Sequence, residues 1–371
     1  MRILYMIPWF HSGTGQETMI QQIVMYGQNL WDSSILSNSF TTYPGVFPDG
    51  YSVNLITMRP YYSLMLPFKK IPAWIKQYDI IHIKSGAPYL WWLNSREIPL
   101  IYTLQGPWIT RTMGYRGKLQ GTLANLAEGE RMLKKADALV GISPWICKYY
   151  KERMGLELTY ILDSFDLHLF QYVSKLPDPG SLRLLIVGDW DGFNGRKRQH
   201  ELIQLMPMLA GEFPGINLRL VGLTHDSMDK LREFAEQKGA AKFISLEGKL
   251  SEPDLAQAYA SSDILVVTST FEGFHRPTVE SMASGTPVLA RDTTSIVGAL
   301  YSSHFLHVKA SGGGETFGIS YDEITEKIWK IIENYKEMAA KGFEYSRQFE
   351  NSTVLPKYEK LYNELISKRG R

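Results

Sequence analysis

The sequence predicts an α/β protein with two domains, each built on a parallel sheet, and three observations support this. Short apolar runs alternate with helical patterns along the whole chain, which is typical of parallel strands joined by helices. The length of 371 residues suits two domains. A polar stretch rich in proline and glycine, residues 175–180, separates two series of strands and predicts a linker.

Composition excludes several classes of protein. With 44% apolar and 21% charged residues, the chain has ample material for two cores. The net charge of +2 is too small to indicate nucleic-acid binding. The single cysteine, Cys147, excludes an internal disulfide and fits a reducing compartment. Residues 1–7 predict a strand rather than a signal peptide, and no apolar run is long enough to predict a transmembrane helix.

The first half begins with the strand at residues 1–7, a glycine-containing loop with His11 and Gly15, and a helix over about 18–30. Further strands and one helix follow in the expected alternation. The strands are predicted at residues 51–57, 78–83, 99–104, 136–143 and 160–166, and the helix at 144–154. His82 lies within an apolar run and is predicted to be a packed strand residue.

The second half opens with a strand over residues 182–188 and a loop over 189–195. Three cations, Arg196, Lys197 and Arg198, then precede a helix predicted over 199–209. Positive charge at a helix start opposes the helix dipole, so the triplet indicates a bound anion. A solvated basic face remains the alternative interpretation.

The elements that follow continue the alternation. We predict strands at 217–221 and 243–246, helices at 226–238, 322–340 and 354–368, and a surface loop at 311–314. Ser251 is a good N-cap for a helix that begins just after the loop Gly248-Lys249-Leu250.

Residues 263–290 carry the main functional prediction of the sequence. An apolar strand over 264–267 leads into a polar loop, a short helix with Pro277 in its first turn, Gly285 at its end, and another apolar strand. The loop follows the carboxyl end of a parallel strand, where α/β sheets bind ligands, and the helix start suits phosphate. Two carboxylates, Glu272 and Glu280, flank that position and would accept hydrogen bonds from hydroxyl groups on both sides of the phosphate. The pattern therefore predicts a nucleotide-sugar site.

These residues carry a family resemblance. Glu272-Gly273-Phe274, Pro277, Glu280, Met282-Ala283, Gly285 and Pro287-Val288 resemble the E-x7-E signature of the retaining glycosyltransferases of family 4. The resemblance implies the GT-B fold: α/β, with two Rossmann-like domains whose parallel sheets face each other across a cleft, and a C-terminal helix that crosses back to the first domain. On this basis, residues 1–172 would bind the acceptor, 181–350 the donor, and 351–371 would form the returning helix.

The resemblance also implies a reaction and a set of site residues. A sugar would move, with retention of configuration, from a UDP- or GDP-sugar to a hydroxyl of a glycan, a lipid-linked or a small-molecule acceptor. No metal and no cofactor beyond the donor would be required. The implied catalytic residues are Glu272, Lys197 and Gln105. The implied donor-binding residues are Glu280, Gly273, Phe274, His275, Arg276, Pro277, Arg196, Gly15, Gly248, Lys249 and Leu250.

The chain departs from the family pattern at three places. Gln105 stands where the family usually has a histidine, and Asp189 stands where it has an arginine after the first strand of the second domain. Either Arg196 or Arg198 could replace that arginine. His275-Arg276 replace smaller residues, and Arg276 could compensate for Asp189 by gripping phosphate. Two alternatives to a transferase remain open: a sugar-nucleotide epimerase of similar fold and a non-catalytic sugar-nucleotide binder.

The first half is rich in aromatic and basic side chains, which interleave at residues 61–70 and 108–118. Seven of the nine tryptophans precede residue 150: Trp9, Trp31, Trp74, Trp91, Trp92, Trp108 and Trp145. Such a surface fits peripheral contact with an anionic membrane, a carbohydrate platform, or simply a core. We expect a cytoplasmic protein, with contact at the inner membrane face as one interpretation.

Overall fold

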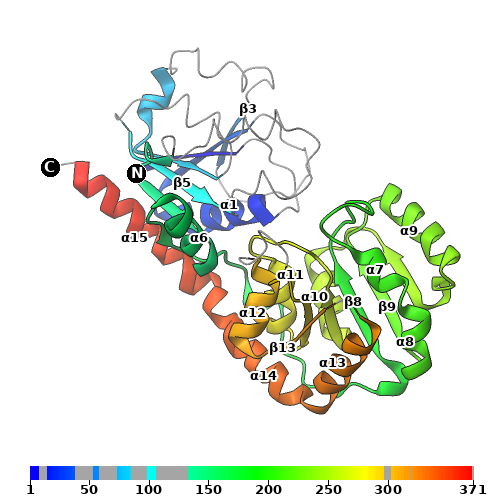
Figure 1. The fold of residues 1–371 in the computed structure, drawn as a ribbon. Helices are drawn as coiled ribbons and strands as arrows, with labels where there is room; N and C mark the ends of the chain where they lie inside the picture. The colour runs from blue at the N-terminus through cyan, green and yellow to red at the C-terminus, as the bar shows by residue number, and fades with distance from the viewer. Residues whose placement is uncertain are drawn as a thin grey trace. The chain divides into compact units, whose positions relative to one another are not determined.

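The computed structural model divides the chain into two compact units. The first comprises Met1–Phe165 together with Phe349–Arg371, and the second comprises Asp166–Gln348. Each unit contains one parallel sheet, which confirms the predicted fold class (Figure 1). The structure describes residues 1–7, 15–37, 53–57, 73–84, 98–105, 133–295, 302–318 and 320–369.

The sheet of the first unit has seven strands in the order β3-β2-β1-β4-β5-β6-β7. Its strands are β1 (Arg2–Met6), β2 (Asp32–Ser37), β3 (Val53–Thr57), β4 (Ile80–Ile83), β5 (Leu100–Leu104), β6 (Ala138–Gly141) and β7 (Thr159–Tyr160). Strand β1 lies at the centre, with Tyr5 paired to Ile35 on one side and to His82 on the other. Apolar side chains at strands β1, β4 and β5 are buried on both faces, as expected of a parallel sheet covered by helices.

The described helices of the first unit are α1 (Gly15–Tyr26), α6 (Pro144–Met154) and α15 (Asn351–Arg369), with 3-10 turns η1 (Gly27–Asn29) and η3 (Ala73–Gln77). Helix α6 has the predicted bounds. Ser143 caps its start by accepting a hydrogen bond from the Ile146 amide at 3.2 Å, and Gly155 ends it in the left-handed region at φ 63°. Helix α1 begins earlier and ends earlier than the apolar pattern predicted.

The final helix, α15, belongs to the first unit although it follows the second unit in sequence (Figure 1). Its Tyr362 hydroxyl lies 2.8 Å from Nδ1 of His82, and Nε2 of His82 lies 2.7 Å from the Thr103 hydroxyl. His82 is fully buried, as predicted for a packed strand residue. The helix is therefore attached to β4 and β5 by a satisfied buried polar cluster.

The sheet of the second unit has six strands in the order β10-β9-β8-β11-β12-β13. They are β8 (Arg183–Val187), β9 (Asn217–Val221), β10 (Ile244–Glu247), β11 (Ile264–Val267), β12 (Val288–Arg291) and β13 (Gly314–Phe317). The order reverses between β8 and β11, so the loops that follow these two strands lie side by side at the carboxyl edge. Open α/β sheets bind ligands at such a switch point.

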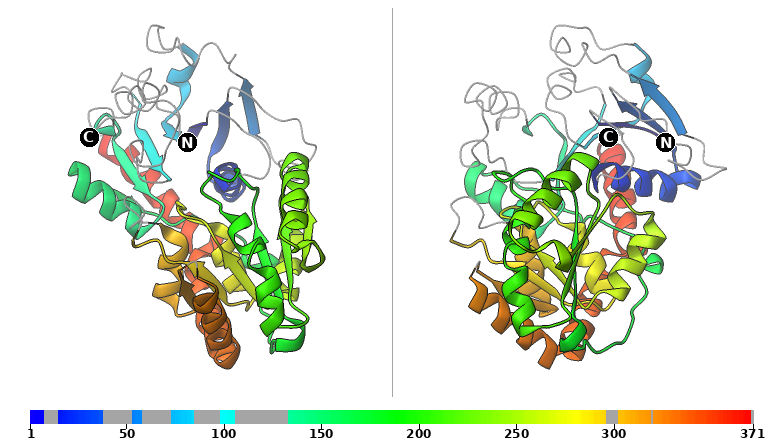
Figure 2. Two further views of the ribbon diagram at one scale, coloured as in Figure 1. Left: turned by 45° about the vertical axis from the view of Figure 1, so that its right-hand side comes forward. Right: turned by 90° about the vertical axis from the view of Figure 1, so that its right-hand side faces the viewer.

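Helices cover both faces of this sheet (Figure 2). They are α7 (Gln199–Ile203), α8 (Met206–Glu212), α9 (His225–Gln237), α10 (Glu252–Ser261), α11 (Arg276–Ala283), α12 (Ser303–Ser311), α13 (Tyr321–Glu333) and α14 (Tyr335–Ser346). Side chains from α7, α8, α9 and α13 share one apolar core with the sheet. Helices α10, α11 and α12 contact β8, β11 and β12 respectively.

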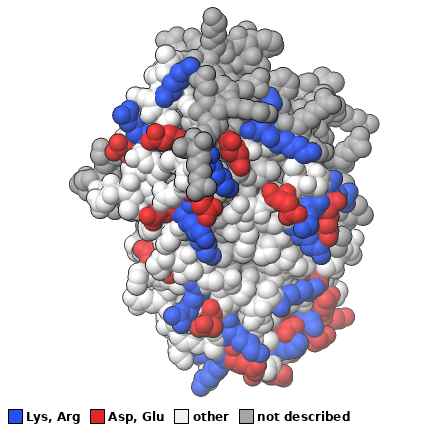
Figure 3. Space-filling model, turned by 90° about the vertical axis from the view of Figure 1, so that its left-hand side faces the viewer, with Lys and Arg blue, Asp and Glu red and all other residues white. Residues whose placement is uncertain are grey.

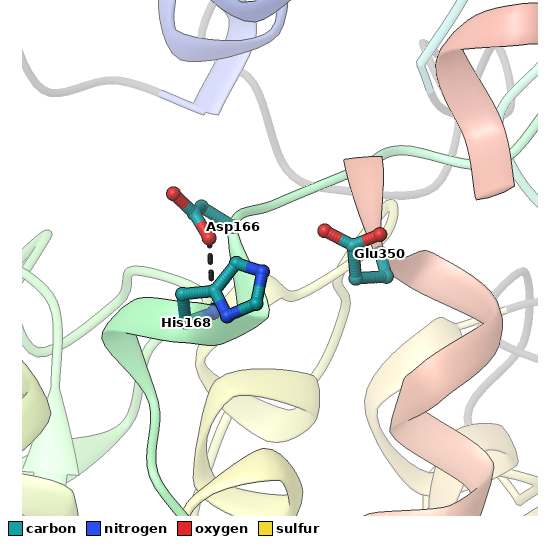
Figure 4. A group of neighbouring side chains, drawn as sticks. All are labelled: Asp166, His168 and Glu350. Atoms are coloured by element: carbon teal, nitrogen blue, oxygen red, sulfur yellow. Dashed lines mark hydrogen bonds between the residues drawn. The ribbon is translucent and has the colours of Figure 1, made fainter. Parts of the chain in front are cut away.

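Short 3-10 turns complete the described chain: η4 (Leu167–Leu169), η5 (Pro179–Ser181), η6 (Ala241–Phe243) and η7 (Arg347–Phe349). Asp166 caps η4, because its carboxylate accepts a hydrogen bond from the His168 amide at 2.9 Å (Figure 4). Glu350 plays a similar part at the start of α15, where it accepts from the Ser352 amide at 2.7 Å. Both carboxylates thus satisfy amide groups that the turns leave unpaired.

Two helices predicted in the second unit were wrong in detail. The helix predicted over 199–209 is two helices, because Pro207 cannot continue a helix begun at Gln199. The helix predicted over 322–340 breaks at Asn334, between α13 and α14. The loop predicted at 311–314 is a short connection from the end of α12 to the edge strand β13, and Gly312 ends the helix at φ 66°.

Two further features of the described residues concern membranes and surface charge. Among the described residues, no helix is both long and apolar enough to cross a membrane. On the face shown in Figure 3, basic and acidic side chains are interspersed rather than gathered into a patch of one sign. The two segments of interleaved aromatic and basic residues, 61–70 and 108–118, lie outside the described residues.

Candidate functional site

The candidate site is built on the loop between β11 and α11. Strand β11 is fully buried between β8 and β12, so this loop emerges at the carboxyl edge of the sheet. Pro277 is in the first turn of α11, as predicted. His275 precedes the helix in the left-handed region, at φ 57°, where its Nδ1 lies 2.7 Å from the Thr278 hydroxyl. A non-glycine residue held at positive φ is costly and is typical of functional loops.

Glu272 is the central acid of this loop, and its side chain is almost completely buried. Lys197 Nζ lies 2.7 Å from Oε1, and an Arg196 guanidinium nitrogen lies 2.7 Å from Oε2. The Ser269 hydroxyl also donates to Oε1 at 2.8 Å. Burial opposes ionisation of the carboxyl group, but Lys197, His275 and Arg196 outweigh it and hold the pKa of Glu272 well below its usual range. Glu272 is therefore a carboxylate held between two cations.

The two cations are positioned by their own backbone. The Asp191 carboxylate accepts hydrogen bonds from the amides of Arg196 and Lys197, each at 2.9 Å. The carbonyl of Arg196 accepts from the Thr270 amide at 2.8 Å, which joins the loop after β8 to the loop after β11. Because hydrogen bonds hold the backbone of Arg196 and Lys197, pairing their side chains with Glu272 costs little further conformational entropy.

Arg198 points elsewhere. It occupies the left-handed region at φ 53°, and its guanidinium donates to the Phe193 carbonyl and lies 3.5 Å from Glu201. The sequence left open whether Arg196 or Arg198 would join Lys197. The structure brings Arg196, and not Arg198, to Glu272.

Glu280 lies on α11 and has partners on α10 and on α11 itself. Its Oε2 accepts from the Tyr259 hydroxyl at 2.9 Å, and its Oε1 accepts from Arg276 Nε at 3.2 Å. Arg276, which the sequence assigned to phosphate, thus contacts Glu280 one turn along the same helix. A carboxylate oxygen accepts more than one hydrogen bond, so Glu280 keeps acceptor capacity beyond these two.

Asp189, the departure at the end of β8, binds the start of α9. Its Oδ1 accepts from the Thr224 amide at 2.9 Å and from the Thr224 hydroxyl at 3.3 Å. Thr224 is the N-cap of α9, so this acid stabilises a helix start rather than facing Glu272. The position that holds an arginine in the family pattern here connects β8 to α9.

The other predicted site residues are distributed as follows. Gly248, Lys249 and Leu250 follow β10 at the carboxyl edge of the second sheet, and the Gly248 carbonyl accepts from the Gly222 amide at 3.1 Å. Gly273 and Phe274 lie between Glu272 and His275, with Phe274 buried. Gln105 directly follows β5 in the first unit and is partly exposed, and Gly15 is the first residue of α1. His11 lies outside the described residues.

Sequence interpretation missed several residues of the site. The Tyr259 hydroxyl bonds Glu280, and the Ser269 hydroxyl bonds Glu272. Only Tyr259 left a signal in the sequence, because the hydroxyl of a tyrosine buried by an amphipathic helix needs a partner. Ser302, Ser303 and His307 of α12 and its N-cap contact the Glu272 loop, and His304 contacts Ser302. Among the described residues, no three metal-ligating side chains gather within either unit.

Comparisons with known proteins agree with this architecture. A family model described as glycosyl transferases group 1 matches residues 184–349, and one described as Glycosyltransferase Family 4 matches residues 14–161. Glycogen synthase of Mycobacterium tuberculosis is 24% identical over 230 residues, which cover 60% of this chain and 53% of that protein. Phosphatidyl-myo-inositol mannosyltransferase of Mycobacterium leprae is 23% identical over 291 residues, covering 77% of this chain and 73% of that protein. The chain spans about half the length of the first of these relatives.

Solved structures resemble the whole chain. Sucrose-phosphate synthase from Thermosynechococcus elongatus gives a TM-score of 0.77 at 19% identity, covering 99% of both chains. Anabaena HepE, solved in complex with UDP and glucose, gives a TM-score of 0.72 at 17% identity, covering 98% of this chain and 100% of that one. The chain therefore shares the GT-B fold of these structures, and each of its halves matches a family model of glycosyltransferases.

Proposed function

We propose that this protein is a retaining glycosyltransferase that moves a sugar from a nucleotide-sugar donor, a UDP- or GDP-sugar, to a hydroxyl group of an acceptor. One observation carries the proposal: two cations, Lys197 and Arg196, meet a buried carboxylate, Glu272, at the carboxyl edge of the second sheet. Cations there suit a diphosphate, and a carboxylate suits the hydroxyls of a sugar. The matches to two glycosyltransferase models support the same conclusion.

Lys197 and Arg196 would bind the diphosphate and stabilise the charge that develops on it as the bond to the sugar breaks. Phosphate oxygens would then compete with Glu272 for the two cations. The start of α11 adds unpaired amides and a partial positive charge, with His275, Arg276 and Pro277 at its first turn. Two cations and a helix start neutralise a diphosphate without a divalent ion, so we expect transfer to continue in the presence of a chelator.

Glu272 would accept hydrogen bonds from the donor sugar, and Glu280 from the ribose. Gly273 and Phe274 would border the sugar, and Gly248, Lys249 and Leu250 would contact the base through backbone groups. From the first unit, Gln105 would orient the donor sugar by hydrogen bonding, without acid–base work, and Gly15 would approach the donor phosphates.

Retention follows from the order of events at the anomeric carbon. The bond to the diphosphate loosens first, which leaves an oxocarbenium-like sugar and a negatively charged leaving group. The acceptor hydroxyl attacks from the face that the diphosphate leaves, and its proton passes to a phosphate oxygen. Lys197 and Arg196 lower the barrier by stabilising the leaving group's charge throughout this sequence.

The acceptor is proposed only as a class: a hydroxyl of a glycan, a lipid-linked or a small-molecule compound. The names of the relatives point to different acceptors, since they include a glycogen synthase, D-inositol 3-phosphate glycosyltransferases and a phosphatidyl-myo-inositol mannosyltransferase. We further propose a cytoplasmic protein that contacts the inner membrane face through basic and aromatic residues of its first half. Binding to anionic liposomes at low salt tests this contact, and failure to sediment with them would exclude it.

The function is tested by incubating the protein with a panel of UDP-, GDP- and ADP-sugars and measuring release of the nucleoside diphosphate, first without and then with candidate acceptors. We expect turnover with one donor, resistance to EDTA, and a product whose anomeric configuration, measured by NMR, matches that of the donor. Conversion of the donor to a second nucleotide sugar without an acceptor would show an epimerase instead. Binding of a donor with no turnover under any condition would show a non-catalytic binder.

A further inference from the structure

Residues at the start of α12 bond both the main-chain amide and the main-chain carbonyl of Glu272. Ser302 is the N-cap of α12, yet its hydroxyl does not cap that helix. It accepts instead a hydrogen bond from the Glu272 amide at 2.7 Å. The next residue, Ser303, donates its amide to the Glu272 carbonyl at 3.0 Å and its hydroxyl at 3.3 Å. The Ser302 hydroxyl therefore bonds the main chain of Glu272 instead of capping α12.

His304 fixes the direction of these bonds. Its Nε2 lies 3.0 Å from the Arg291 carbonyl, which only accepts, so Nε2 carries the proton and Nδ1 is an acceptor. Nδ1 lies 2.7 Å from the Ser302 oxygen, so the Ser302 hydroxyl donates to it. The Ser302 oxygen then presents its lone pairs to the Glu272 amide. One chain of hydrogen bonds thus runs from strand β12 through His304 and Ser302 to Glu272.

His307, one turn further along α12, holds the loop at a second point. Its Nε2 donates to the Phe274 carbonyl at 2.9 Å, and its Nδ1 accepts from the Tyr345 hydroxyl of α14 at 2.9 Å. The ring also packs edge-on against Phe274, with centroids 5.1 Å apart. Helix α12 therefore bonds the main chain on both sides of Gly273.

Buried polar side chains are concentrated at the start of α12. Ser302, Ser303, His304 and His307 are each no more than 1% exposed, so four polar side chains have been buried at one helix start. Buried polar groups cost free energy unless their geometry is satisfied, and each of these is satisfied by the Glu272 loop or by a residue that orients it. Their shared target is the segment that carries the site's central acid.

We propose that Ser302, His304 and His307 are positioning residues, which hold the Glu272 carboxylate in line with Lys197 and Arg196. As a contribution to catalysis, this inference rests on the proposed function. These residues do not touch the reacting groups, and they act through the main chain of residues 272–274. If the loop were loosened, Asp191 would still hold the amides of Arg196 and Lys197, but the acid that meets the sugar would be misplaced.

The variants Ser302→Ala and His307→Leu remove one main-chain bond each, and His307→Gln restores a donor near the position of Nε2. Ser320→Ala is the matched control, because Ser320 caps its own helix, α13, and is exposed. Loss of that cap costs about 1 kcal/mol of stability without touching the Glu272 loop. Two measurements follow: donor turnover, and hydrogen–deuterium exchange of the peptide spanning residues 268–276.

We expect Ser302→Ala and His307→Leu to lower kcat at least about tenfold, with binding of the matching nucleoside diphosphate unchanged, and His307→Gln to recover most of that loss. Exchange in residues 268–276 should rise in the same two variants and not in Ser320→Ala. Equal exchange in Ser302→Ala and Ser320→Ala, or unchanged kcat in both loop variants, would overturn the proposal. If the wild-type protein turned over no nucleotide sugar, the proposed function would fail, and the exchange measurement would still decide whether α12 holds this loop.

Discussion

Lys197 Nζ and Glu272 Oε1 lie 2.7 Å apart, although 75 positions separate the two residues in sequence. They meet because β8 and β11 are neighbours in the sheet, so that the loops that follow them share one edge. Removing Glu272 would leave Lys197 and Arg196 without the carboxylate that they share, which is unfavourable. The two loops therefore act as one unit, and a ligand that attracts Lys197 also acts on Glu272.

Substitutions within the basic triplet separate its members by function. Lys197→Ala should reduce donor turnover by roughly 100-fold or more, because it removes a cation that stabilises the leaving diphosphate. Arg196→Ala should act in the same direction. Arg198→Ala is the internal control, since this side chain contacts Phe193 and Glu201 instead, and turnover should stay within about threefold of wild type. Similar losses at positions 197 and 198 would contradict the assignment.

The returning helix gives a prediction about stability. Tyr362→Phe deletes the hydroxyl that lies 2.8 Å from Nδ1 of the buried His82, and should cost about 1–3 kcal/mol in the free energy of unfolding. Tyr26→Phe is the comparison, because its hydroxyl contacts Glu359 at a partly exposed position where water can replace it. Urea denaturation followed by fluorescence measures both. Equal losses of unfolding free energy in the two variants would show that the buried His82 contact contributes no more than the exposed one.

Buried histidines predict a pH dependence of stability. Burial lowers the pKa of His304 to about 4 and that of His307 to about 3. An unfolded histidine has a pKa of about 6.5, so between these values the unfolded chain binds more protons, and stability must rise with pH. The protein should therefore lose stability as the pH falls from about 6.5 towards 4, with His304 alone contributing roughly 3 kcal/mol.

Urea midpoints at pH 7.5 and pH 5.0 measure this loss. His304→Asn keeps an acceptor for the Ser302 hydroxyl but does not titrate, so its midpoint should change less with pH than that of the wild type. His225→Asn, at an exposed position on α9, should keep the full wild-type dependence. A wild-type midpoint that does not change between the two pH values would contradict the buried, neutral histidines.

The sequence was sufficient where local pattern and packing agree. Helix α6 and the cap at Ser251 are local choices, and strand β11 with Pro277 in α11 follows from apolar runs and proline geometry. Strand β2 was not predicted, because three of its six residues are serines. Those serines are buried in the sheet, which tertiary context alone decides.

Which side chains pair within the site could not be predicted from the sequence. Arg196 and Arg198 have the same chemistry and flank the same lysine, and only the left-handed backbone at Arg198 turns one of them away. The partners of Glu272 on α12 lie 30 or more positions away and have no motif of their own. Such contacts depend on how helices pack on the sheet, and periodicity does not carry that information.

The most direct test of the account is donor turnover by Glu272→Ala, compared with Glu315→Ala. Glu315 is also a partly buried acid of the second unit that contacts two lysines, Lys327 and Lys330, but it lies on the edge strand β13. We expect Glu272→Ala to remain folded and bind the nucleoside diphosphate yet lose transfer, and Glu315→Ala to transfer the sugar at close to the wild-type rate. Wild-type transfer by Glu272→Ala would contradict the account.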